Sequence, residues 1–129
     1  MLVTGVDIIE IERIERVAGK YGDRFLQRIY TQSEREYCRG RAPQLASRFA
    51  AKEATMKALG TGIRGVGWKD IEIKRRSGSA PYIKLHGRAL KRSDQIGLHE
   101  LALSLTHSKD FAIASVVGES EKGNLIPRN

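Results

Sequence analysis

Two carboxylates lie in apolar stretches of this 129-residue chain, where an ionised group needs a partner. Asp7 lies in the β-branched segment 2–9, and Glu53 lies in segment 43–59, one helical turn before Lys57. Two carboxylates near positive charge match the usual way in which proteins hold Mg²⁺, with the phosphates of a substrate as further ligands. Phosphoryl chemistry is therefore the leading hypothesis, although residues so far apart in sequence need not meet in space.

Each carboxylate also has an ordinary structural interpretation. Glu53 could form a solvent-exposed i,i+4 pair with Lys57, which is worth only about 0.2–0.5 kcal/mol. Small Ala46 and Ala50 beside Glu53 leave room for a ligand, so both interpretations of Glu53 stay open. Asp7 could cap the helix that follows it. Otherwise we expect it at the end of a sheet, because burial in mid-strand would leave its carboxylate unpaired.

Other candidates for chemistry are few. His107 ends an alternating segment and could contact a phosphate or satisfy the backbone of the next turn. The three histidines are scattered without zinc-ligand spacing, and the single cysteine, Cys38, excludes an internal disulfide. No Ser/His/Asp order is apparent, so we do not expect hydrolysis by a nucleophile triad.

Segment 43–59 predicts the element around which the chain is organised. It reads as one helix, with proline in its first turn and Gly60 at its end. At about 100° per residue, one apolar arc runs along this helix and includes Glu53. The other members of the arc are Leu45, Ala46, Phe49, Ala50 and Met56.

The remaining segments predict a small antiparallel sheet and further helices. Strands are expected at 2–9, 68–75, 82–85, 101–107 and 111–117. Helices are expected at 10–22, 23–30, 31–40 and 87–97, the third of which begins with a capping box at Thr31. In both of the last two strands, the large side chains are expected to cover a helix. We therefore expect one α+β domain over residues 1–118 and a polar C-terminal tail over residues 119–129.

The charge of the chain indicates an anionic partner. Basic residues outnumber acidic ones by 23 to 15, and residues 37–99 alone hold fourteen basic and four acidic residues. Such a balance favours nucleic acid, a phosphorylated small molecule or an acidic protein. The sequence has neither a signal-peptide pattern nor an apolar run near the roughly 20 residues of a membrane span. We expect a cytoplasmic protein that does not bind a membrane.

Three ordered stretches resemble one known family. They are residues 3–14 (VTGVDIIEIERI), residues 48–59 (RFAAKEATMKAL), and residues 103–108 (LSLTHS) followed by 111–114 (FAIA). Together they resemble holo-acyl-carrier-protein synthase, the short bacterial class of 4′-phosphopantetheinyl transferases. Three stretches in one order are far more specific than any one of them.

The resemblance implies a reaction and its residues. The 4′-phosphopantetheine arm of coenzyme A would move to a serine hydroxyl of apo-acyl carrier protein, of fatty acid biosynthesis or another pathway, with release of adenosine 3′,5′-bisphosphate. Asp7 and Glu53 would be catalytic residues and magnesium ligands. Lys57 would be catalytic and would neutralise the pyrophosphate, while Arg48 and His107 would also contact coenzyme A. The base that accepts the serine proton, a carboxylate, Lys57 or a water, is left open.

The resemblance also implies an architecture. It is an α+β fold with a small antiparallel sheet packed on a long central helix, in a homotrimer with coenzyme A between neighbouring subunits. Arg13, Arg16 and Lys20 of the first helix would dock the acidic recognition helix of the carrier protein, which accounts for the basic excess without nucleic acid. The competing hypothesis, a small basic domain that binds RNA or DNA, has support from charge alone. A third is a structural subunit with a degenerate site.

Overall fold

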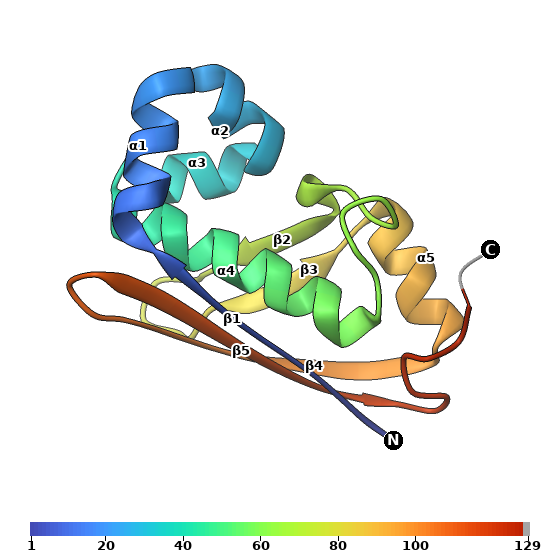
Figure 1. Cartoon of the computed structure of the whole chain (residues 1–129). Helices are drawn as coiled ribbons and strands as arrows, with labels where there is room; N and C mark the ends of the chain where they lie inside the picture. Colours follow the sequence, from blue (N-terminus) through green and yellow to red (C-terminus); the bar gives the residue numbers. More distant parts are fainter. Residues whose placement is uncertain (128–129) are drawn as a thin grey trace.

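A computed structural model describes residues 1–127, and it has the α+β arrangement that the sequence predicted (Figure 1). The strands are β1 (Leu2–Glu10), β2 (Ile71–Lys74), β3 (Tyr82–Leu85), β4 (Leu98–His107) and β5 (Phe111–Ser120). The helices are α1 (Ile11–Tyr21), α2 (Asp23–Ile29), α3 (Gln32–Cys38), α4 (Ala42–Leu59) and α5 (Gly87–Gln95), with a 3₁₀ turn at Trp68–Asp70. The last two residues of the expected tail 119–129 lie outside the described part of the chain.

Helix α4 is the element that the other parts surround. Pro43 lies in its first turn, and Gly60 ends it in the left-handed conformation with a φ of 71°. The expectation of a single apolar arc was wrong, because the helix is buried on several sides and even Arg48 and Lys52 are inside. The reason is that α4 packs at once against the larger sheet, α1, α3, β2 and α5. The periodicity of a helix with one solvent-exposed face therefore does not apply to it.

The larger sheet has the strand order β1-β5-β4 and is antiparallel throughout. The prediction that the large side chains of β5 cover the helix was wrong. Ala112, Ala114 and Val116 are buried on the helix side, whereas the larger Phe111 is exposed on the other face. The approach is closest at β1, where a Cβ atom at Gly5 would overlap the carbonyl oxygen of Ala54 in α4.

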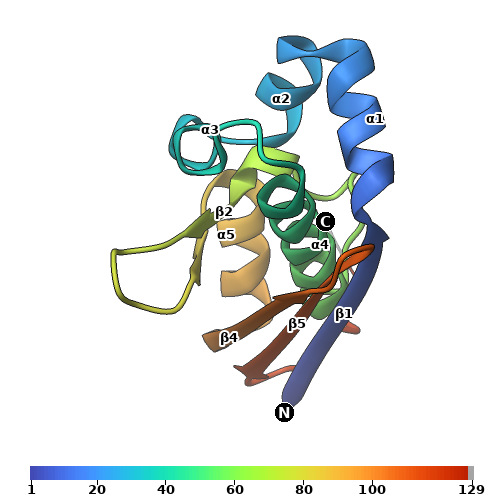
Figure 2. The same cartoon turned by 90° about the vertical axis from the view of Figure 1, so that its left-hand side faces the viewer.

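Figure 2 shows how the elements divide around α4. β1 and α1 lie on one flank of the helix, whereas β4 and the β2–β3 hairpin lie on the other, with β5 between them below. Helices α1, α2 and α3 gather at the amino-terminal end of α4 (Figure 1). Within residues 1–127, no helix combines the length and the apolar character that crossing a bilayer requires.

A buried ion pair ties α3 and α4 to the second sheet. Lys52 Nζ lies 2.8 Å from Glu34 Oε1, and neither side chain has any exposed surface. Lys52 also donates to the carbonyl oxygen of Ile71, while Glu34 accepts from the backbone N–H of Ile73 at 2.8 Å and completes the predicted capping box with Thr31. Burial lowers the pKa of Lys52, and the charge of Glu34 opposes that shift. Each buried charge thus has the partner that it needs.

The C-terminal segment closes the carboxyl end of α4. Asn124 Nδ2 donates to the carbonyl oxygen of Ala58 at 2.9 Å, and Arg92 Nε donates to that of Leu59 at 2.8 Å. Arg92 also donates to the backbone carbonyl of Asn124 at 2.9 Å. These bonds satisfy carbonyl groups that the end of a helix otherwise leaves without partners. They also fix the last turn of α4, to which Lys57 belongs.

Replacing Lys52 with methionine should lower the free energy of unfolding by about 3–5 kcal/mol, because Glu34 would stay buried without its cation. The double variant Lys52→Met/Glu34→Gln should recover much of this loss, because the amide leaves no buried charge. Urea denaturation at pH 7 measures both variants. Equal losses in the single and double variants would show that an uncompensated charge is not the cause.

Candidate active site

The two predicted carboxylates meet on the flank of α4 that faces β1. Glu53 of α4 lies near enough to Asp7 for the Asp7 carboxylate to raise the pKa of Glu53, and the Asp7 side chain is 13% exposed. Both structural expectations for Asp7 were wrong. It lies in the body of β1, opposite Ala114 of β5, and the residue at the N-cap of α1 is Glu10. A carboxylate is tolerated in mid-strand because it has partners on α4.

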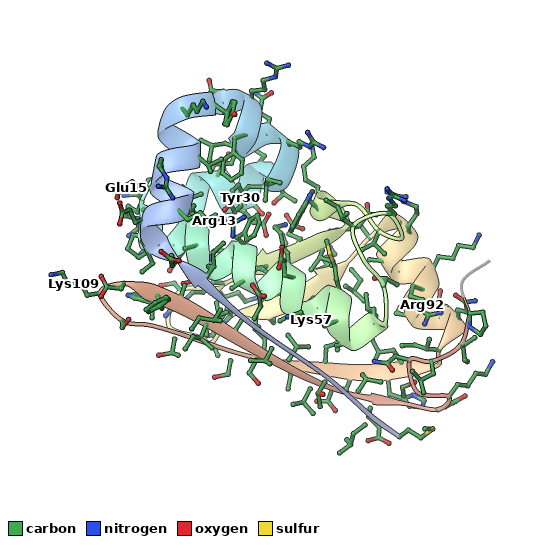
Figure 3. All side chains as sticks on the ribbon, viewed as in Figure 1. Arg13, Glu15, Tyr30, Lys57, Arg92 and Lys109 are labelled. Atoms are coloured by element: carbon green, nitrogen blue, oxygen red, sulfur yellow. The ribbon has the colours of Figure 1, made fainter. Side chains whose placement is uncertain are left out.

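Lys57 joins this cluster from one turn further along α4. Its Nζ donates to the carbonyl oxygen of Val6 at 2.9 Å and lies 3.4 Å from Asp7 Oδ1. The simple i,i+4 ion pair was therefore the wrong interpretation, because among residues 1–127 the ion-pair partner of Lys57 is Asp7 rather than Glu53. The Lys57 side chain is 56% exposed and lies beside β1, where a ligand can reach it (Figure 3).

The charges of this cluster suit a cation. Burial raises the pKa of Glu53 and the Asp7 carboxylate raises it further, whereas the charges of Lys57 and Arg13 lower it. Two carboxylates this close repel each other when both are ionised, and a bound divalent cation relieves that repulsion. The pair is the donor set that Mg²⁺ uses when substrate phosphates supply the other oxygens. No group of three or more His, Cys, Asp or Glu ligands forms within residues 1–127, so water and substrate would complete the coordination.

A hollow of about 430 Å³ lies beside the predicted docking helix, between α1 and α2. Val17 and the half-buried Phe25 line it together with Arg24 and Arg28. The predicted residues Arg13, Arg16 and Lys20 lie on the exposed side of α1. Sequence reasoning did not single out Arg24 or Arg28, because the short polar segment of α2 carries no charge pattern that distinguishes it from a solvated face.

A basic pocket lies on the opposite flank of α4, next to β4 and the chain that leaves β2. Its volume is about 290 Å³, and it brings together the predicted residues Arg48 and His107. Tyr37 and Arg75 also line it, and the sequence analysis missed both. The available signal was the pair of adjacent arginines that begins at Arg75, in a predicted turn.

A single chain holds the carboxylate cluster and the basic pocket apart. Arg48 precedes Glu53 by five residues, which corresponds to about 140° around the helix axis. The body of α4 therefore stands between the two sites. Arg48 faces the side of β4, whereas Glu53 faces β1.

Comparison with known proteins identifies relatives of this chain. The family model of the 4′-phosphopantetheinyl transferase superfamily matches residues 4–116. The holo-[acyl-carrier-protein] synthase of Herpetosiphon aurantiacus is 46% identical over 125 residues, which cover 92% of this chain and 98% of the relative. The match therefore extends over nearly the whole length of both proteins.

Solved structures agree with the sequence relatives. Helicobacter pylori holo-[acyl-carrier-protein] synthase in complex with coenzyme A has a TM-score of 0.82 and 35% identity, over 90% of this chain and 99% of the other. The Bacillus anthracis enzyme of the same name, in complex with CoA (3′,5′-ADP), has a TM-score of 0.74 and 38% identity, over 92% and 96% of the two chains. The fold, the order of the sequence stretches and these relatives agree, and the chain belongs to the 4′-phosphopantetheinyl transferase superfamily.

Proposed function

We propose that this chain is a holo-acyl-carrier-protein synthase. It transfers the 4′-phosphopantetheine group of coenzyme A to a serine of apo-acyl carrier protein and releases adenosine 3′,5′-bisphosphate. The observation that carries this proposal is the Asp7–Glu53 carboxylate pair with Lys57 beside it, on a chain whose full-length relatives bear this name. The cytoplasmic location expected from the sequence stays a prediction.

In this reaction the serine oxygen forms a bond to the phosphorus that carries the pantetheine arm. The phosphoanhydride bond breaks, its electron pair leaves with adenosine 3′,5′-bisphosphate, and the serine hydroxyl loses its proton to a base. Asp7 and Glu53 would hold Mg²⁺, which when bound withdraws charge from the phosphorus under attack. Lys57, exposed at the rim of the pair, lies where it can neutralise the pyrophosphate oxygens.

We propose further that copies of the chain share the site, in the homotrimer that the family resemblance implies. The outer face of the larger sheet is apolar and exposed. Its exposed members on β1 and β5 are Leu2, Val6, Ile8, Phe111 and Val117, with exposed fractions of 42–71%. Val6 and Ile8 point to this face, whereas Asp7 between them points to α4. Because β1 is an edge strand of the sheet, a copy that covers the outer face and reaches round that edge would lie next to the carboxylates. Its basic pocket would then complete a site whose halves one chain holds apart.

The carrier protein would dock at α1 and α2. The hollow there has apolar walls from Val17 and Phe25 and basic groups from Arg24 and Arg28. This combination suits an amphipathic helix with acidic residues beside its apolar face. Arg13 adds a link to the reaction centre, because its charge also lowers the pKa of Glu53.

Intact-mass spectrometry of an apo-acyl carrier protein, incubated with this protein and coenzyme A, tests the proposed reaction. The carrier protein should gain the mass of one phosphopantetheine when Mg²⁺ is present and gain nothing when a chelator removes it. A gain that resists chelation would contradict the role of Asp7 and Glu53 as metal ligands. No gain with several carrier proteins, together with salt-sensitive RNA binding, would favour the nucleic-acid alternative.

Reversing a charge at the hollow should weaken use of the carrier protein. We expect Arg24→Glu to raise the KM for the carrier protein by about tenfold, the loss of roughly one charged contact, and to leave the KM for coenzyme A unchanged. Lys91→Glu, an equal reversal on the exposed side of α5, is the matched control and should change neither value. Steady-state kinetics with each substrate varied in turn measure the effect. A parallel rise of both KM values in Arg24→Glu would exclude docking at this hollow.

A further inference from the structure

Tyr37 contacts two arginines that have no carboxylate partner in the described chain. The guanidinium carbon of Arg48 lies 4.3 Å from the centroid of the Tyr37 ring. Nη1 of Arg75 donates to the Tyr37 hydroxyl oxygen at 3.3 Å. Within residues 1–127, neither Arg48 nor Arg75 belongs to an ion pair. One aromatic side chain of α3 thus holds two unneutralised cations at the wall of the basic pocket.

Arg48 is a buried cation without an anionic partner among residues 1–127. The side chain is only 4% exposed, and its Nε has no hydrogen-bond partner among residues 1–127. A buried guanidinium without an anion is costly. The contact with the Tyr37 ring recovers only part of that cost. An anionic ligand in the pocket would supply the rest.

Tyr37 is itself held firmly in place. Arg41 Nη2 donates to the backbone carbonyl of Tyr37 at 2.6 Å, and Arg41 Nε donates to that of Cys38 at 2.9 Å. The Arg41 guanidinium also lies 5.5 Å from the centroid of the same ring. These contacts close the end of α3 at the start of α4, so the ring has a fixed position relative to Arg48.

The segment that carries Arg75 is anchored in a similar way. Glu72 of β2 accepts hydrogen bonds from the hydroxyl groups of Thr31 and Ser33, both at 2.7 Å, and contacts the His86 ring at 2.9 Å. Burial alone would raise the pKa of Glu72, but these hydrogen bonds lower it to about 2. The carboxylate is therefore ionised at neutral pH and fixes β2, and Arg75 directly follows that strand.

We propose that Tyr37 is a positioning residue that aligns Arg48 and Arg75 on the 3′-phosphate of coenzyme A. This inference rests on the proposed function, in which Lys57 and the carboxylate pair take the pyrophosphate. The phosphate that remains is the 3′-monoester, which carries a charge of about −1.5 to −2 at pH 7 and three acceptor oxygens. Guanidinium groups match that geometry with two parallel hydrogen bonds. Tyr37 would thereby set the preference for coenzyme A over its 3′-dephospho form.

Titration calorimetry with adenosine 3′,5′-bisphosphate and adenosine 5′-monophosphate tests this role without any turnover. The wild-type protein should bind the bisphosphate about tenfold or more tightly, as expected for a charge-assisted contact. Tyr37→Leu should bring that ratio close to one and leave the affinity for the monophosphate unchanged. Tyr37→Phe, which keeps the ring and loses the hydroxyl contact with Arg75, should give an intermediate ratio. The monophosphate is the matched control for any general loss of structure.

Three results would overturn the inference. They are a wild-type ratio close to one, an equal loss for both nucleotides in Tyr37→Leu, and inorganic phosphate that binds as tightly as the bisphosphate. The last result would mean that the pocket takes a free anion rather than coenzyme A.

Transfer kinetics with coenzyme A and 3′-dephospho-coenzyme A then connect binding to the reaction. Tyr37→Leu should raise the KM for coenzyme A alone and keep kcat, and a fall in kcat with both substrates would overturn a positioning role. If the wild-type protein transfers from neither substrate, the proposed function fails, while the calorimetric ratio still decides the role of Tyr37.

Discussion

The close approach of α4 to β1 is the constraint on which the site depends. Gly5 has no side chain, and this lets the backbone of β1 pass directly against the carbonyl oxygen of Ala54. Asp7 lies two residues further along the same face of the strand, and Glu53 directly precedes Ala54 in the helix. The contact that seats the helix therefore also brings the two carboxylates together, so the site needs no loop to assemble it.

Because α4 is buried on several sides, the partners of its charged residues indicate what each of those residues does. Lys52 has Glu34 as its counter-ion inside the fold, together with backbone carbonyls, and this arrangement accounts for its burial. Arg48, four residues earlier and also buried, contacts an aromatic ring and a pocket wall, and it has no counter-ion among residues 1–127. The contrast separates a charge that holds the fold together from a charge that awaits a ligand. It also accounts for the excess of basic residues in the middle of the chain. Some of them, such as Lys52, stabilise the fold, whereas others, such as Arg48, would bind a ligand.

Local sequence signals predicted the helices and strands well. They could not predict the roles of residues whose partners come from other elements. The bounds of α4 followed from its proline and glycine, and the capping box at Thr31 followed from four adjacent residues. The position of Asp7 was wrong because its partners come from α4, which no local pattern of β1 reveals. Tyr37 was missed for the same reason, since the arginines that give it a role arrive from two other elements. The pairing of Asp7 with Glu53 came from a family resemblance, and spacing alone could not have established it.

We propose that the carboxylate pair of one chain works with the basic pocket of another. Glu53→Gln and Arg48→Leu each remove one half, so each protein alone should have little transfer activity at a coenzyme A concentration near the wild-type KM. Co-expression with two different tags, followed by purification through both, yields assemblies that contain both variants. We expect such mixed assemblies to regain transfer activity, because the intact Glu53 of one chain meets the intact Arg48 of its neighbour. Mixed assemblies that stay as inactive as either variant alone would contradict it and would mean that both halves must come from the same chain.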